Sequence, residues 1–138
     1  MTTAMSRTLG ALFLVATFLM LIMSSCMSKE EKILDNIVNQ KKAEIPYELI
    51  SDVKVTDIKY STSDKLVTYT YTVEPGLIAS TVKRAPELLK QGIAISISNS
   101  DDEKDFKKAL IDAQANIKCV VLCDEDTIAD FDINYIDL

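Results

Sequence analysis

The residues that could do chemistry are few, and the first group is a run of acids near the C-terminus. Asp124, Glu125 and Asp126 are consecutive, and Asp130 and Asp132 follow shortly after. Carboxylates can bind calcium, but an EF-hand loop needs a glycine at its sixth position and a glutamate at its twelfth, and this segment has neither. Carboxylate pairs also hydrolyse glycosidic bonds, yet nothing in the spacing selects a pair. We interpret these acids as solvated turn and strand residues, and we predict no metal site.

Histidine is absent from all 138 residues. This removes the commonest general base and the commonest zinc ligand, so serine and cysteine triads of the usual kind are excluded. Cys119 and Cys123 lie four residues apart in a segment typical of a strand. In a strand they would share a face about 13 Å apart, beyond the roughly 7 Å between Cα atoms that a disulfide tolerates. Both are most simply core residues, and we predict no catalytic residue and no cofactor.

Three tyrosines form the remaining candidate site. Tyr69 and Tyr71 alternate with threonines and so share one face of a predicted strand, and Tyr60 lies on the strand before it. If helices cover that face, the tyrosines belong to the core. If the face is bare, they form a surface for a ligand or partner. The sequence leaves both interpretations open.

Length and charge limit the partners. The chain has room for a single core, and its formal net charge is −6. An acidic surface is a poor partner for nucleic acid, so we exclude that class.

The N-terminal segment has the three parts of a secretory signal. Residues 1–8 carry one positive charge, at Arg7; residues 9–23 are uncharged and mostly apolar; and Ser24 and Ser25 are small. We predict a signal peptide over residues 1–25. An uncleaved membrane anchor is the alternative, because the apolar run approaches the lower length limit of a spanning helix.

The cysteine after this segment favours cleavage. The letters "MSSC", which end at Cys26, resemble the lipobox of bacterial lipoproteins, although Met23 replaces the usual leucine. The resemblance implies that Cys26 becomes the first residue and carries diacylglycerol and palmitate, with two or more chains giving a stable anchor. It places the protein in the envelope of a Gram-negative bacterium, in the outer rather than the inner membrane, facing the periplasm or the cell surface.

Charged residues follow the cysteine directly. The "KEE" that ends at Glu31 resembles the export tag of surface lipoproteins in Bacteroidetes. The same residues also form a capping box with Ser28, in which the serine oxygen binds the Glu31 amide and the glutamate binds back. Ile33, Leu34 and Val38 continue at helical spacing, which predicts a helix over residues 29–42.

Strands and further helices follow. Two β-rich runs separated by "STSD" predict a hairpin over 52–73, with a bulge near Thr56 because the apolar parity changes there. Helices are predicted over 77–98, broken near Ala85 by Pro86; residues 91–98 also alternate like a strand, but we favour a helix. Ser100 and Glu103 predict a second capping box, which starts a helix over 101–115. The last hairpin, over 118–136, is expected to turn Phe131, Ile133 and Tyr135 inward.

The order helix, hairpin, helices, hairpin predicts a fold class. We expect one α+β domain over 26–138, in which a four-stranded antiparallel sheet has helices on one face, and the element order leaves an αββ repeat open. The element order resembles small αββ folds of periplasmic lipoproteins and of β-lactamase inhibitor proteins.

These features favour a non-enzymatic, membrane-tethered lipoprotein that binds an envelope protein or a peptide. An inhibitor or immunity-type protein is one alternative. A carboxylate-based hydrolase acting on envelope glycans or peptides is another, and it would require two acids converging in a cleft. An exposed tyrosine or apolar patch would instead favour binding.

Overall fold

The computed structural model describes residues 27–138, so Cys26 and the predicted signal peptide lie outside the described part. Its elements in chain order are α2 (Lys29–Lys42), β1 (Tyr47–Ile50), β2 (Val53–Ser61), β3 (Leu66–Val73), α3 (Leu77–Arg84), α4 (Pro86–Asn99), the 3₁₀ turn η1 (Asp101–Glu103), α5 (Lys104–Ala113), β4 (Asn116–Cys123), β5 (Asp126–Ile133) and the 3₁₀ turn η2 (Tyr135–Asp137). The α+β class agrees with the prediction.

The sheet differs from the predicted one. It has five strands in the order β1-β2-β3-β4-β5, and the central pair β3–β4 is parallel, whereas four antiparallel strands were expected. The parallel pair arises because α3, α4 and α5 carry the chain back from the end of β3 to its start, where Asn116 pairs with Leu66. The αββ repeat is also not reproduced, because β1 adds a third strand to the first half.

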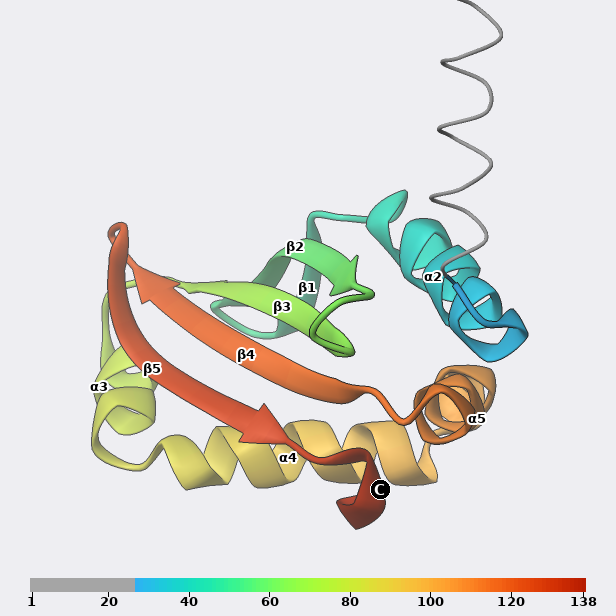
Figure 1. Ribbon diagram of the computed structural model, residues 1–138. Coiled ribbons are helices and arrows are strands. Elements are labelled where there is room, and N and C mark those ends of the chain that lie inside the picture. The colour runs from blue at the N-terminus through green and yellow to red at the C-terminus, as the bar shows by residue number, and fades with distance from the viewer. Residues whose placement is uncertain (1–26) are drawn as a thin grey trace, which may run out of the picture.

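The buried residues of the central strands alternate. In β3 every second residue from Val67 to Val73 is buried, and in β4 Ile117, Cys119 and Val121 are buried in the same way. This face of the sheet packs against the helices, with α4 running along β4 and β5 and with α2 and α5 at one end (Figure 1). The result is two layers with one core between them.

The predicted bulge in β2 is confirmed. The register of β2 against β3 shifts between Val55 and Asp57, so Thr56 has no partner in the ladder. Its hydroxyl lies 3.1 Å from the hydroxyl of Thr72 and 3.3 Å from the carbonyl oxygen of Thr70. The extra residue lets both Val55 and Ile58 face the core.

One predicted capping box is confirmed and the other is wrong. At α2, the Glu31 amide donates to the Ser28 hydroxyl at 3.2 Å, and the Ser28 amide donates to the Glu31 carboxylate at 3.1 Å. At Ser100 no side-chain cap forms: the Glu103 amide donates to the Ser100 carbonyl oxygen at 3.1 Å, and the Glu103 carboxylate accepts bonds from the Lys41 ammonium at 2.7 and 2.9 Å. A charged partner competes better for the carboxylate than a backbone amide does.

Residues 77–99 form two helices that meet at Ala85, where φ is −139° and ψ is 69°. Pro86 then occupies the first turn of α4, the position in a helix that tolerates proline. Residues 91–98 are helical throughout.

The C-terminal hairpin ends earlier than predicted. Asp124 and Glu125 turn the chain with φ of 49° and 69°, and β5 ends at Ile133. Phe131, half-buried, and Ile133, buried, pack on the core side of β5 together with Ala129, as predicted for the first two. Tyr135 instead lies beyond the strand, in η2.

Candidate functional site

An apolar groove of about 510 Å³ separates the edge strand β1 from α3 and α4. Its strand wall is formed by Leu49 and Ile50. Leu49 is half-buried and packs against the core, whereas Ile50 is 51% exposed. Every residue that lines the groove is uncharged.

The α3 wall consists of Leu77, Ile78, Thr81 and Val82. These positions are one and four residues apart, so they lie on one side of the helix. Val82 reaches the core, but Leu77 at the helix start is 79% exposed. The groove therefore begins in the core and opens to solvent at Leu77.

The α4 wall consists of Leu88, Leu89, Gly92, Ile93 and Ser96, which again share one side of a helix. Ile93 is buried, whereas Leu88 is 61% exposed. Residues 91–100 contain no charged residue, although 26% of the chain is charged. A solvated helix normally carries charge on its outer face, so this composition is typical of a surface that a partner covers.

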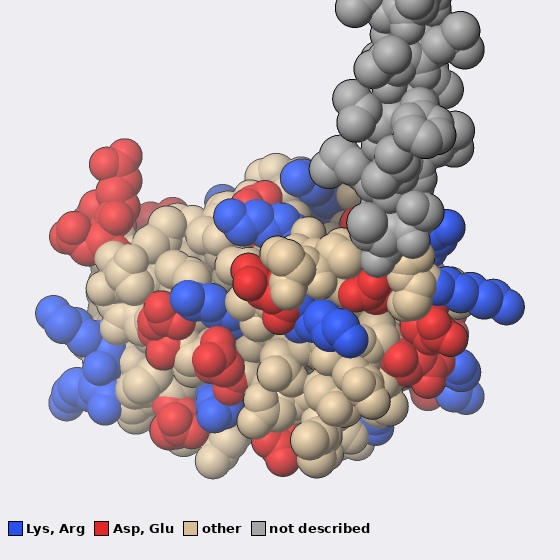
Figure 2. All heavy atoms as spheres, viewed as in Figure 1, with Lys and Arg blue, Asp and Glu red and all other residues tan. Residues whose placement is uncertain are grey.

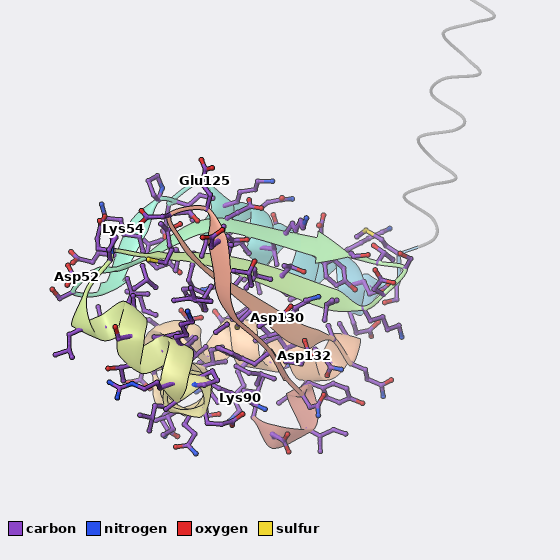
Figure 3. The ribbon with its side chains drawn as sticks, turned by 90° about the vertical axis from the view of Figure 1, so that its left-hand side faces the viewer. Asp52, Lys54, Lys90, Glu125, Asp130 and Asp132 are labelled. Atoms are coloured by element: carbon purple, nitrogen blue, oxygen red, sulfur yellow. The ribbon has the colours of Figure 1, made fainter. Side chains whose placement is uncertain are left out.

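Charged side chains lie around this groove but do not line it. Figure 3 looks onto it and shows Asp52 and Lys54 above α3, near the β1–β2 turn, and Lys90 below, on α4. Glu125 projects from the β4–β5 turn, and Asp130 and Asp132 lie along β5. Three large apolar side chains at a groove with charges around it fit a partner segment with one apolar face.

A second groove, of about 740 Å³, lies between α2 and α5 and is mostly charged. Glu44, Asp102 and Asp105 line it together with two ion pairs. Figure 2 shows acidic and basic side chains close together at this end of the molecule. Its floor includes apolar residues of both helices.

Two of the five acids that line this groove are in ion pairs. The Lys41 ammonium lies 2.7 Å from Glu103 and 4.7 Å from the centre of the Phe106 ring, and the Lys108 ammonium lies 2.6 Å from Asp112. A carboxylate hydrolase needs a general acid that is free to donate a proton. Glu103 and Asp112 are both engaged with ammonium groups, and the Lys41–Glu103 pair links α2 to η1, just before α5.

The tyrosines that the sequence singled out do not form a bare surface. Tyr69 is 5% and Tyr71 is 2% exposed, their stacked ring centres are 5.8 Å apart, and the edge of Phe106 meets Tyr69. Burial raises the pKa of both phenols well above its ordinary value. The core interpretation therefore holds for this pair, because the helices cover that face of the sheet.

Tyr60 is half-buried on β2 and fixes α2. Its hydroxyl donates a 3.0 Å hydrogen bond to Glu31, whose side chain is buried. Burial, followed by the bond to Glu31, raises the pKa of Tyr60. The residue has a structural partner and is not part of the apolar groove.

The cysteines are also structural in the described part of the chain. Cys119 is fully buried, and burial raises the pKa of its thiol to about 12. Cys123 is half-buried at the end of β4, and both thiols are free. Among residues 27–138, no cluster of acids and cysteines could hold a metal ion, and no helix is long and apolar enough to span a bilayer.

The groove was not predicted from the sequence. Its helical residues all fall within the range 77–98, for which only helices were predicted. Two signals were present: the charge-free run over 91–100, and Gly92 inside a helix.

The fold, but not the sequence, matches known proteins. No family model matches the chain, and a search of curated proteins found no match. Among solved structures, a putative secreted protein from Pseudomonas aeruginosa is similar with a TM-score of 0.62 at 10% identity, over 80% of this chain and 97% of that one.

Two further similar structures are pilotins of type II secretion systems. The pilotin from Vibrio vulnificus matches with a TM-score of 0.57 at 18% identity, over 83% of this chain and 96% of its own. The pilotin from Vibrio cholerae matches with a TM-score of 0.59 at 14% identity, over 84% and 98%. At these identities the similarity establishes a shared fold.

Proposed function

We propose that the chain is a membrane-tethered, non-enzymatic envelope protein that binds an amphipathic segment of another envelope protein in the groove between β1, α3 and α4. The observation that carries the proposal is the exposure of Leu77, Leu88 and Ile50 around one uncharged cavity. Their burial by a partner would remove apolar surface from water, at about 25 cal/mol per Å².

The fold supports the same role by analogy. Two similar structures are pilotins of type II secretion systems, so a component of a secretion system is a reasonable partner class. In the charged groove, by contrast, Glu103 and Asp112 are engaged in ion pairs. A tether at Cys26 would hold the protein in the envelope of a Gram-negative bacterium, where such a partner is assembled.

Site-specific photo-crosslinking in the native host tests the binding role. The full-length protein carries p-benzoylphenylalanine in place of Leu77, and a matched variant carries it in place of Ile136, which is 78% exposed but lies outside the groove. We expect a discrete adduct with one envelope protein from position 77 and none from position 136. The proposal fails if position 77 gives no adduct, or if both positions give the same ones.

The tether is tested separately by the mass of the mature protein. We expect cleavage before Cys26 and a mass increase corresponding to acyl chains, with both lost in Cys26→Ala. An uncut and unmodified N-terminus in the native host would contradict the lipoprotein assignment without affecting the groove.

A further inference from the structure

Gly92 lies in the middle of α4, on the wall of the apolar groove, and the fold gives no reason for it. Its backbone is helical, whereas Gly76 is the glycine of the described chain that has a positive φ, at 149°. A Cβ built at Gly92 would meet no atom within 4 Å. A helix with glycine in its interior is less stable than the same helix with alanine. Gly92 therefore lowers the stability of the free protein, and no contact within the fold compensates for this loss.

From this we infer that Gly92 is where an α-helix of the partner crosses α4, with its backbone too close for any side chain at position 92. The inference rests on the proposed function and identifies its partner as a helix. A glycine is the residue that permits such an approach of another backbone. Leu88 and Ser96 lie one turn to either side, so the partner would meet a notch between a large and a small side chain.

A helix fits these walls better than a strand does. The residues of α3 and α4 that face the groove form helical ridges, which accept the side chains of another helix between them. An extended segment would instead pair with the free edge of β1 and would take its main affinity from backbone hydrogen bonds there. Binding of such a segment would not explain why α4 lacks a side chain at position 92.

Three substitutions in the full-length protein with p-benzoylphenylalanine at position 77 test the inference in the native host. Position 77 lies on α3, so the probe and residue 92 are on different helices. Gly92→Leu fills the notch, Gly92→Ala adds one methyl group, and Gln91→Leu adds the same leucine at an exposed neighbouring position that does not line the groove. Thermal unfolding of each variant is measured alongside.

We expect Gly92→Leu to reduce the adduct about tenfold and Gln91→Leu to leave it unchanged. Gly92→Ala should raise the melting temperature by about 4 °C and still weaken the adduct, a combination that a merely structural glycine would not show. An undiminished adduct in Gly92→Leu would overturn the inference and leave the proposed function intact. No adduct in the parent with Gly92 would overturn the proposed function itself.

The geometry of the adduct gives a second readout. Crosslinkers placed in turn at Ile50, Leu77 and Leu88 should map to partner residues spaced three or four apart, as one face of a helix requires. Partner residues spaced two apart would indicate a strand and would also overturn the inference.

Discussion

The two grooves of this molecule differ in the residues that line them, which are mostly charged in one and uncharged in the other. Between α2 and α5, Lys41 and Glu103 pair across the gap, with 16% and 25% of their side chains exposed, over a buried Phe106. Between β1, α3 and α4 there is no charge in the lining, and large side chains such as Leu77 face solvent. The first groove has two internal ion pairs, whereas the apolar rim of the second stays exposed.

This difference separates stability from binding. Contacts that are complete within the chain stabilise the fold, and their loss lowers the free energy of unfolding. An apolar rim that the fold leaves exposed contributes little until another molecule covers it. Substitutions in the α2–α5 groove should therefore affect folding, and those in the apolar groove should affect association.

The largest expected effect is at Phe106, which is 1% exposed. Phe106→Ala should lower the free energy of unfolding by about 3 to 5 kcal/mol, because it removes a buried ring from between Tyr69 and Lys41. Leu88→Ala, its counterpart in the apolar groove, should change stability by less than about 0.5 kcal/mol. Urea unfolding followed by circular dichroism measures both, and equal losses would remove the distinction between the grooves.

The next effect is on binding. Leu88→Asp should weaken association by about 2 kcal/mol, or roughly thirtyfold, because it places a charge against an apolar partner. Folding should not suffer, since an acid in the first turn of α4 interacts favourably with the helix dipole. The crosslink from position 77 reports the binding loss, with Ile136→Asp as the control. A parallel fall in melting temperature would show that the rim belongs to the fold.

A smaller effect is expected from the ion pair that joins α2 to η1. A double-mutant cycle of Lys41→Met and Glu103→Gln should give a coupling of about 1 to 2 kcal/mol in the free energy of unfolding. The Lys108–Asp112 pair has side chains that are 76% and 44% exposed, and its cycle should give a clearly smaller coupling. A zero coupling for Lys41 and Glu103 would mean that the α2–α5 groove is not held by its charges.

The smallest effect concerns alkaline pH on the α2 side. The folded state raises the pKa of Tyr60, so it holds the phenolic proton more tightly than the unfolded chain does, and this stability is full below about pH 10 and lost as pH rises further. Tyr60→Phe should cost about 1 kcal/mol at pH 7 through the lost bond to Glu31. The difference in the free energy of unfolding between the variant and the parent should shrink above pH 10. A difference that stays constant in unfolding titrations would contradict this prediction.

Local patterns in the sequence predicted local structure well. The capping box at Ser28 and the bulge at Thr56 depend on residues a few positions apart, and both are present. The parallel pairing of β3 with β4 could not be predicted in the same way, because strand partners depend on where the crossover 74–115 returns the chain. Strand β1 was missed because four residues are too few to show an alternating pattern.

The site was harder to predict than the fold. Periodicity assigns an apolar residue to a helix face, but it does not say whether a neighbour covers that face. Tyr69 and Tyr71 were therefore named as a candidate binding surface although the helices bury them, and Leu88 was not named although it is exposed. Exposure depends on the relative positions of β1, α3 and α4, which are far apart in the chain.

The parallel contact at the centre of the sheet also affects how the protein folds. Strand β3 pairs with β4 only after the whole segment 74–115 has been made and placed, so this contact has a long sequence separation and should form late. Until then the first three strands form an incomplete sheet with an open inner edge. Export of an unfolded chain, which the predicted signal peptide would require, is compatible with this order, because the sheet would be completed only after its last strands have crossed the membrane.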